Sequence, residues 1–303
     1  MHFKHCSSLL PLLLIFLSTS VAVSQSTDAV RWNLKQGEKL KVELQQDTGF
    51  KTNIGNRSQE VGNQMTMFVD WEVESAADDS FVIAQTITRI KLTVNIPDEN
   101  GIQQTRLDTA SDDQTGKLAE QLIEQINPLI GLKFQVTMSN RGEIKNVDIP
   151  KASLEAIRQA PSSMQIRQVI TADGLRELIG QSAIVFPESS VAKGESWDSQ
   201  TKVTNALGDF NKTNKFTFDG PQSIDAGEYQ QFTVTTTVDE KMKEGAALKN
   251  FGGNGKIWFS ADAPMILRSQ TTNQMTSERR YRERIIESTV TTEIKMKVSR
   301  DNG

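Results

Sequence analysis

Apolar residues alternate with polar residues through most of this chain, and this period of two constrains the fold more than any other feature. The stretch KLKVELQ, from Lys39, places Leu40, Val42 and Leu44 on one side, and QMTMFVDWEV, from Gln64, repeats the pattern. Further runs of this kind continue almost to the end of the sequence. Successive side chains of a β-strand point to opposite faces, so each run predicts a strand with one buried face.

Short polar segments join these runs in the manner of β-turns. PDENG begins with proline and ends with glycine, SNRGE links Met138 to Ile144, and DGPQSIDAGEY separates two further apolar runs. Strands at such short spacing predict an antiparallel meander. Within FVIAQTITRIKLTV the inward-facing set changes parity between Ile83 and Ile90, which predicts a β-bulge or a bend.

Helical spacing is confined to the middle of the chain. Between residues 111 and 130, Leu118, Leu122, Ile123 and Ile126 recur at intervals of three or four. PKASLEAIRQA, from residue 150, and QIRQVITADGLRELIG, from residue 165, predict a second and a third helix. We therefore expect an α+β fold, mainly antiparallel β, with two curved meander halves and a helical insert between them.

The two strand-rich regions resemble each other. KQGEKLKVELQ, from Lys35, is similar to AKGESWDSQTKV, from Ala192, and the strands after them follow in step. This similarity indicates an internal repeat, unless it reflects only the general likeness of meanders. The patterns divide the chain into a signal peptide at 1–24, a first β-meander half at 25–107, a helical insert at 108–182 that includes a β-hairpin near 132–149, and a second β-meander half at 183–303.

The N-terminal stretch MHFKHCSSLLPLLLIFLSTSVAVSQ has the pattern of a secretory signal peptide. Its apolar core, from Leu9 to Leu17, is too short to span a membrane, and Ala22 and Ser24 fit the positions before a cleavage site. We expect cleavage after Ser24 and an exported protein, periplasmic or extracellular, that is soluble after cleavage and has no transmembrane segment.

Cleavage would also remove the residue types that most catalytic and metal sites need. The histidines and the single cysteine of the chain, His2, His5 and Cys6, all lie in this leader. A mature chain without them cannot form catalytic triads that need histidine or cysteine, zinc sites with thiolate or imidazole ligands, or the usual haem ligands. We expect no cofactor and no enzymatic activity. The net charge of −4 argues against nucleic acid as a partner.

Carboxylates are the remaining catalytic candidates. Asp70 and Glu72 share a strand face opposite the apolar one, so we expect them to face solvent. Asp78 and Asp79 lie in a turn, where aspartate is favoured for its backbone hydrogen bonds. A glycoside hydrolase would need two such carboxyl groups facing each other across a cleft.

Acidic turns give candidate calcium ligands, namely Asp108, Asp112 and Asp113, or Asp98 with Asn100. Neither set has the ligand spacing of an EF-hand loop. The alternatives are a helix N-terminus, where acidic residues suit the helix dipole, and a hairpin turn. We therefore expect no metal site.

Two groups of residues are candidates for ligand binding. The apolar group would line a cavity for an acyl chain in a strongly bent sheet, or it would form a packed core. The arginine group would bind an anionic headgroup or a sugar acid, or it would form a solvated hairpin tip. The apolar group comprises Met65, Met67, Trp71, Phe134, Met138, Trp258 and Phe259, and the arginine group comprises Arg279, Arg280, Arg282 and Arg284.

Three segments, FPESSVAKGESW, DAGEY and GNGKIWFSADAPMILRSQ, resemble an exported bacterial family of uncharacterised function. The resemblance implies a signal peptide followed by repeated strands around a few helices, and it brings no established catalytic residues. More loosely, a curved meander with inserted helices is similar in fold to the periplasmic lipoprotein carriers, which bind acyl chains.

These observations give three functional hypotheses. The leading one is a non-enzymatic exported binding protein whose partner is an apolar or amphipathic small molecule. The alternative is a structural or interaction protein of the cell envelope without a ligand cavity, with a protein partner that the sequence does not identify. The third is a carboxylate-based hydrolase.

Overall fold

The computed structural model of the chain describes residues 29–55, 57–98, 101–111, 114–116, 118–151, 155, 184–205, 208–225, 227–242, 246–281 and 284–301. The predicted signal peptide, the third predicted helix and most of the second lie outside these residues. The described residues form twelve strands of one antiparallel sheet, together with one short α-helix and one 3₁₀ turn. The expected fold class, mainly antiparallel β, is confirmed.

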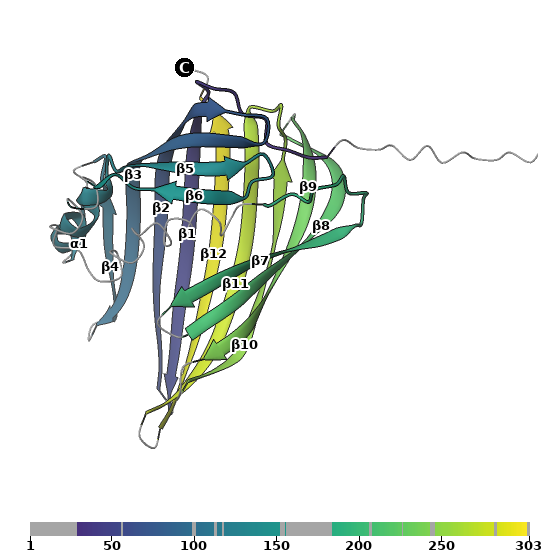
Figure 1. The fold of residues 1–303 in the computed structure, drawn as a ribbon. Coiled ribbons are helices and arrows are strands. Elements are labelled where there is room, and N and C mark those ends of the chain that lie inside the picture. The colour runs from purple at the N-terminus through teal and green to yellow at the C-terminus, as the bar shows by residue number, and fades with distance from the viewer. Residues whose placement is uncertain are drawn as a thin grey trace, which may run out of the picture.

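Most strands pair with the strand that precedes or follows them in the sequence. The sheet order is β6-β5-β3-β2-β1-β12-β11-β10-β9-β8-β7, and β4 pairs with the far end of β3. The first half contains β1 (Lys39–Ile54), β2 (Arg57–Ala76), β3 (Ser80–Asp98), β4 (Gly101–Asp108), β5 (Lys133–Ser139) and β6 (Ile144–Asp148). The second half contains β7 (Ser196–Asn205), β8 (Gly208–Ile224), β9 (Gly227–Met242), β10 (Ala246–Phe259), β11 (Met265–Tyr281) and β12 (Arg284–Arg300). The first and last strands, β1 and β12, pair in the middle of the sheet and so join the two halves (Figure 1).

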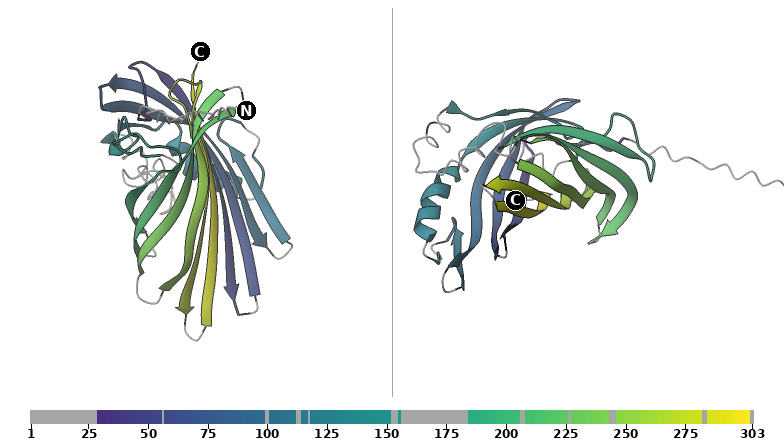
Figure 2. Two further views of the ribbon diagram at one scale, coloured as in Figure 1. Left: turned by 90° about the vertical axis from the view of Figure 1, so that its right-hand side faces the viewer. Right: turned by 90° about the horizontal axis from the view of Figure 1, so that it is seen from below.

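The sheet is strongly curved, and the short strands at its two ends, β5 with β6 and β7, cross in front of the long central strands (Figures 1 and 2). We call the face inside this curve the inner face and the opposite one the outer face. Along β1 the inner face carries buried Leu40, Val42 and Leu44, while Lys39 and Lys41 are exposed on the outer face. The predicted alternation is therefore confirmed where the sheet is covered.

The predicted change of parity in β3 is confirmed as a β-bulge. Ile87 pairs with Val69 and Arg89 pairs with Phe68, so Thr88 is an extra residue in the ladder. Its hydroxyl donates to the carbonyl of Phe68 at 3.2 Å. One inserted residue shifts the inward set by one position, and both Ile87 and the following Ile90 are buried.

The helix predicted at 111–130 is present but shorter, as α1 (Ala119–Ile126) followed by η1 (Asn127–Leu129). The preceding residues are held against β4, because the backbones of Arg106 and Thr115 exchange two hydrogen bonds at 2.9 and 3.0 Å. This bridge prevents the helix from starting earlier. The helix lies beside β4 at one side of the sheet (Figure 1).

The two halves repeat both their strand order and their first turn. The succession β1-β2-β3-β5-β6 corresponds to β7-β8-β9-β10-β11. In each first turn a glycine with positive φ, Gly37 or Gly194, donates its N–H to a carbonyl of the next strand in the sheet. The carboxylate of the following residue, Glu38 or Glu195, accepts an N–H from three residues earlier. The shared turn supports the predicted internal repeat, and among the described residues β4 and α1 have no counterpart in the second half.

One hydrophobic core fills the inner face where these short strands cross it. Aromatic rings from distant segments meet there. Phe186 lies 4.9 Å from Phe259 and 5.6 Å from Phe232, and Trp32 lies 5.2 Å from Phe259, measured between ring centroids. Each buried aromatic contributes about 1.5–3 kcal/mol relative to an exposed one. These contacts hold the segments before β1 and before β7, which carry Trp32 and Phe186, onto the sheet. Together with β5, β6 and β7 we call them the crossing segments.

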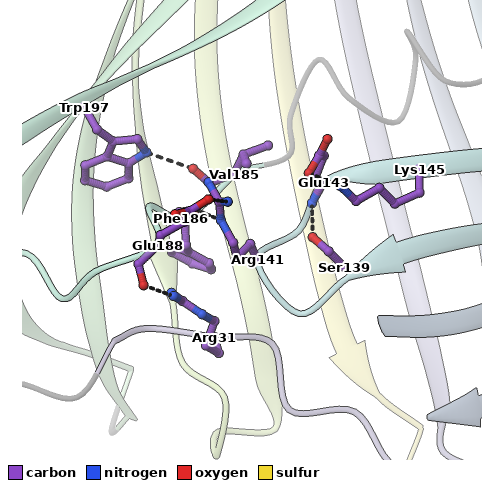
Figure 3. A network of polar contacts seen from close by, with 9 residues as sticks. All are labelled: Arg31, Ser139, Arg141, Glu143, Lys145, Val185, Phe186, Glu188 and Trp197. Carbon is purple, nitrogen blue, oxygen red and sulfur yellow. Dashed lines mark hydrogen bonds and ion pairs between the residues drawn. The ribbon is translucent and has the colours of Figure 1, made fainter. Parts of the chain in front are cut away.

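A network of hydrogen bonds joins the β5–β6 turn to the segments before β1 and before β7 at the same place (Figure 3). Arg141, in the turn between β5 and β6, donates to the Phe186 carbonyl at 2.6 Å and to the Glu188 carboxylate at 3.2 Å. Arg31 donates to the Glu188 carbonyl at 2.6 Å. Trp197 of β7 donates its indole N–H to the backbone carbonyl of Val185, next to Phe186, at 2.8 Å. The network thus closes one end of the curved sheet, which we call the proximal end.

Candidate functional site

The register of the sheet aligns inner-face residues in transverse rows, and beyond the core these rows change in character. A polar row comes first, followed by an apolar row of five side chains. After a further row of mostly polar residues, a terminal row closes the distal end, where β1 and β11 finish. The polar row is Asn63, Thr48, Thr292, Asn273, Gly253 and Thr236; the apolar row is Val61, Phe50, Val290, Met275 and Phe251; the terminal row is Arg57, Ile54, Ile286 and Arg279.

The apolar row remains partly open to solvent. Phe50 is 38% exposed, and the other four side chains are half-buried. On the outer face the same strands carry polar residues at the neighbouring positions, such as Lys51, Glu60 and Asn250. A strand that faces water on both sides does not need this alternation. The inner face is therefore built to keep an apolar surface beyond the end of the packed core.

The polar row and the adjoining core contain buried polar atoms without partners. Three of them come from successive inward positions of β11: the Ser269 and Thr271 hydroxyls and the Asn273 side-chain carbonyl. Ser269 and Thr271 are 2% and 8% exposed. Gly253 and Gly255 of β10 lie beside them, and a side chain at either position would collide with Asn273 or Thr271. An unpaired buried polar group costs about 1–3 kcal/mol, so these atoms favour a polar partner.

The terminal row places exposed isoleucine between arginines. Ile54 is 41% exposed and pairs with Arg57 on one side and Ile286 on the other, and Ile286 pairs in turn with Arg279. Arg57 and Arg279 are exposed and have no ion pair within the described part of the chain. The row is therefore both apolar and cationic.

The apolar group predicted from the sequence is divided between the two faces. Met67, Trp71, Phe134, Met138 and Phe259 are buried in the core, and Met65 packs against it half-buried. Trp258 does not lie with them, so the prediction that it shares their surface was wrong. It is on the outer face, where its indole donates to Gln231 at 3.0 Å and Arg268 lies 5.7 Å from its ring. Consecutive residues of a strand point to opposite faces, so Trp258 and Phe259 cannot share a surface.

The predicted arginine group lies at the hairpin between β11 and β12. By register, Arg279 and Arg284 are on the inner face and Arg280 is on the outer face, whereas Arg282 lies outside the described residues. An extended strand would have placed Arg280, Arg282 and Arg284 on one face. The chain instead turns before Arg284, so that Arg284 pairs back with Tyr281.

Among the carboxylate candidates, the side chain of Asp70 is engaged in an ion pair, and Asp78 and Asp79 lie in a turn held by their backbone. Asp70 accepts a hydrogen bond from Lys41 at 3.0 Å on the outer face, and this bond raises the pKa of Lys41. The backbone carbonyls of Asp78 and Asp79 accept hydrogen bonds from Asn140. Asp112, Asp113 and Asn100 lie outside the described residues. Within the described residues no three acidic, histidine or cysteine side chains gather in a way that could hold a metal ion.

Asp108, the remaining calcium candidate, is paired with Arg89. The guanidinium donates to both carboxylate oxygens, and this contact lowers the pKa of Asp108. A carboxyl group whose pKa is lowered on folding stabilises the protein above its unfolded pKa and loses that contribution as pH falls through its folded pKa. Asp108→Asn is therefore expected to be less stable than the wild type above about pH 4, with the difference shrinking at lower pH.

Urea unfolding of both proteins between about pH 3 and about pH 7 measures this difference. Arg89→Gln removes the same contact and should give the same pH dependence. A difference between Asp108→Asn and the wild type that does not change with pH would contradict the assignment.

A family model described as "Family of unknown function (DUF6263)" matches residues 78–254. The predicted resemblance to a family of uncharacterised function is confirmed, and FPESSVAKGESW and DAGEY lie wholly inside the match. No curated protein matches the chain. In the described residues, no helix has the length and apolar character needed to cross a membrane.

Two solved structures show weak similarity. A structure concerned with lipid–protein interactions in lipovitellin gives a TM-score of 0.44 at 11% identity, covering 89% of this chain and 26% of the lipovitellin chain. The chain thus spans about a quarter of that protein. OccK11 (OpdR) of Pseudomonas aeruginosa gives a TM-score of 0.21 at 7% identity, covering 87% of this chain and 98% of the other.

Sequence reasoning missed the distal rows of the inner face. In β1 the apolar alternation ends at Leu44, and Gln46 and Thr48 occupy the next two inward positions. Phe50 and Ile54 resume it only after this interruption. The signal that could have found them is the period of two from Leu40 to Ile54, if polar residues such as Gln46 and Thr48 are accepted at inward-facing positions.

Proposed function

The chain belongs to the DUF6263 family, whose function is unknown, and we propose that it is a non-enzymatic exported binding protein for an amphipathic ligand. The apolar part of the ligand lies along the apolar row of the inner face. The observation that carries this proposal is the partly exposed row of Val61, Phe50, Val290, Met275 and Phe251, on a sheet whose outer face is polar at the same level.

The apolar row has dimensions that suit an acyl chain. It crosses five adjacent strands, β2, β1, β12, β11 and β10. At about 4.8 Å between strands, the row is roughly 19 Å wide. Covering a half-exposed apolar side chain contributes about 25 cal/mol for each Å² removed from water. Five such side chains favour a long, flexible apolar ligand over a compact one.

The unpaired polar atoms support an amphipathic rather than a purely apolar ligand. Asn273 lies one row from the apolar row on its proximal side, and Thr271 lies one row further. A hydroxyl group of the ligand would donate to the Asn273 side-chain carbonyl, and a hydroxyl or ester oxygen would accept from the Thr271 hydroxyl, so both atoms would gain the partners that they lack. Pairing these groups favours binding, because each is otherwise buried without a hydrogen bond.

A matched pair of substitutions tests the location of the ligand. Phe50→Gln removes an exposed aromatic side chain from the inner face, and Ile285→Gln removes an exposed isoleucine, 52% accessible, from the outer face. Binding of a fluorescent fatty acid to delipidated protein is expected to weaken about tenfold in Phe50→Gln, equivalent to about 1.4 kcal/mol. Ile285→Gln should bind as the wild type does.

Native mass spectrometry of the purified protein, before and after lipid extraction, gives an independent measurement. A co-purifying mass that is lost on extraction and restored by added lipid supports a carrier. If delipidated wild-type protein binds neither fatty acid nor phospholipid, the proposal fails and a structural or interaction protein of the envelope takes its place. Equal weakening by both substitutions would move the ligand away from the inner face.

A further inference from the structure

Two hairpins end side by side at the distal end of the sheet. β1 and β12 stay paired as far as Ile54 and Ile286, so the β1–β2 turn lies next to the β11–β12 turn (Figure 1, bottom). We call these two hairpin ends the tip. It lies toward the opposite end of the sheet from β5 and β6, whose connecting turn carries Arg141 (Figure 1).

The tip exposes large apolar side chains on both faces. Ile54 is 41% exposed on the inner face and Ile285 is 52% exposed on the outer face. A ligand held on the inner face accounts for Ile54 but not for Ile285. Elsewhere on the outer face of these strands the positions are mostly polar, as at Lys51 and Thr289. Ile54 and Ile285 thus give the tip an exposed apolar side chain on each face.

The tip is also basic, although the chain as a whole is acidic with a net charge of −4. Arg57, Arg279, Arg280 and Arg284 are exposed there, on both faces. The neighbouring Glu278 is neutralised by Lys249 at 2.9 Å. Isoleucines at the end of two turns, ringed by arginines, match a lipid interface, where apolar groups enter and cations meet phosphates.

We propose that the tip docks onto the surface of an anionic lipid bilayer. Ile54 and Ile285 enter the interface, and the four arginines lie at the level of the phosphate groups. This docking goes beyond the binding of a single ligand, and it brings the distal end of the inner face to the membrane. Only the terminal row and one row of mostly polar side chains then separate the apolar row from the bilayer.

Vesicle co-sedimentation tests the proposal, using phosphatidylcholine vesicles with and without phosphatidylglycerol. Wild-type protein should bind only the vesicles with phosphatidylglycerol, and less so at high salt. The double variant Arg279→Gln/Arg284→Gln should bind about 25-fold more weakly, since each basic residue near an anionic surface contributes about fivefold. Lys215→Gln/Lys256→Gln, which removes the same charge from exposed sites away from the tip, is the matched control.

The apolar part of the proposal needs its own variant. Ile285→Gln, which leaves the charge unchanged, should weaken vesicle binding while leaving fatty-acid binding in solution unchanged, because Ile285 is not on the inner face. Equal binding to both vesicle types, equal effects of the two double variants, or concentration-dependent dimerisation through the tip without vesicle binding would each overturn membrane docking. None of these outcomes bears on the inner-face ligand, which Phe50→Gln tests separately.

Discussion

Phe259→Ala is expected to lower the free energy of unfolding by about 3–5 kcal/mol, as large aromatic deletions in packed cores do. Phe259 is 1% exposed, and its ring contacts both Phe186 and Trp32, which come from the two segments that cross the inner face. Trp32 lies in the segment before β1 and Phe186 in the segment before β7, and removal of the Phe259 ring leaves a cavity where these two segments meet the sheet. The loss should therefore appear as reduced global stability.

The neighbouring residue is the control for this substitution. Trp258→Ala removes a larger side chain, but one that is half-buried on the outer face with one hydrogen bond and one cation–π contact. The expected cost is about 1–2 kcal/mol. Urea unfolding of both variants, followed by circular dichroism, measures the difference. Equal costs, or a larger cost for Trp258→Ala, would contradict the assignment of the two faces.

The second large effect is expected at Gly142, in the turn between β5 and β6. Its φ is +91°, and an added Cβ would lie within van der Waals overlap of the Ile184 carbonyl and the Trp32 indole nitrogen. Gly142→Ala should cost about 2–5 kcal/mol, from the strain of a left-handed backbone and the overpacking of a fixed contact. The backbone carbonyl cannot move aside, because residues 184–188 are held by the Arg141 network.

Gly131 separates the two causes. Its φ is +80°, similar to that of Gly142, but an added Cβ would meet nothing within 4 Å. Gly131→Ala should cost only about 1–2 kcal/mol, the part that comes from backbone strain. The difference in melting temperature between Gly142→Ala and Gly131→Ala measures the cost of the overlap between the added Cβ and the Ile184 carbonyl and Trp32 indole. If Gly142→Ala is no less stable than Gly131→Ala, the crossing segment is not fixed where the structure places it.

The sequence predicted the strands well because alternation is a local property. Short turns join most successive strands, so pairing between neighbours follows directly from chain order. The bulge at Thr88 was predicted for the same reason, since a change of parity is visible within a single run. The helix at 111–130 was predicted too long because the bridge between Arg106 and Thr115 is a contact with a different element.

The candidate site was predicted less well than the fold. The sequence identified apolar residues such as Trp71 and Phe134, yet burial removes them from the exposed surface. Phe50 and Ile54, which remain exposed, were hidden by the polar residues between Leu44 and Phe50. An inward-facing residue becomes part of the core where another segment of the chain covers the inner face, and it stays exposed where none does. That is set by contacts distant in sequence, such as the one between Arg141 and Phe186.

The period of two by itself determined that this chain forms long antiparallel strands with one apolar face, because side-chain direction follows from backbone geometry alone. Only the tertiary structure decided that β1 pairs with β12, and that the crossing segments cover one end of the inner face and leave the other end partly exposed. Pairing between the first and last strands and the crossing at Gly142 are long-range contacts, and no local pattern encodes them. The same strand pattern is therefore core at one end and, as we propose, a lipid-binding surface at the other.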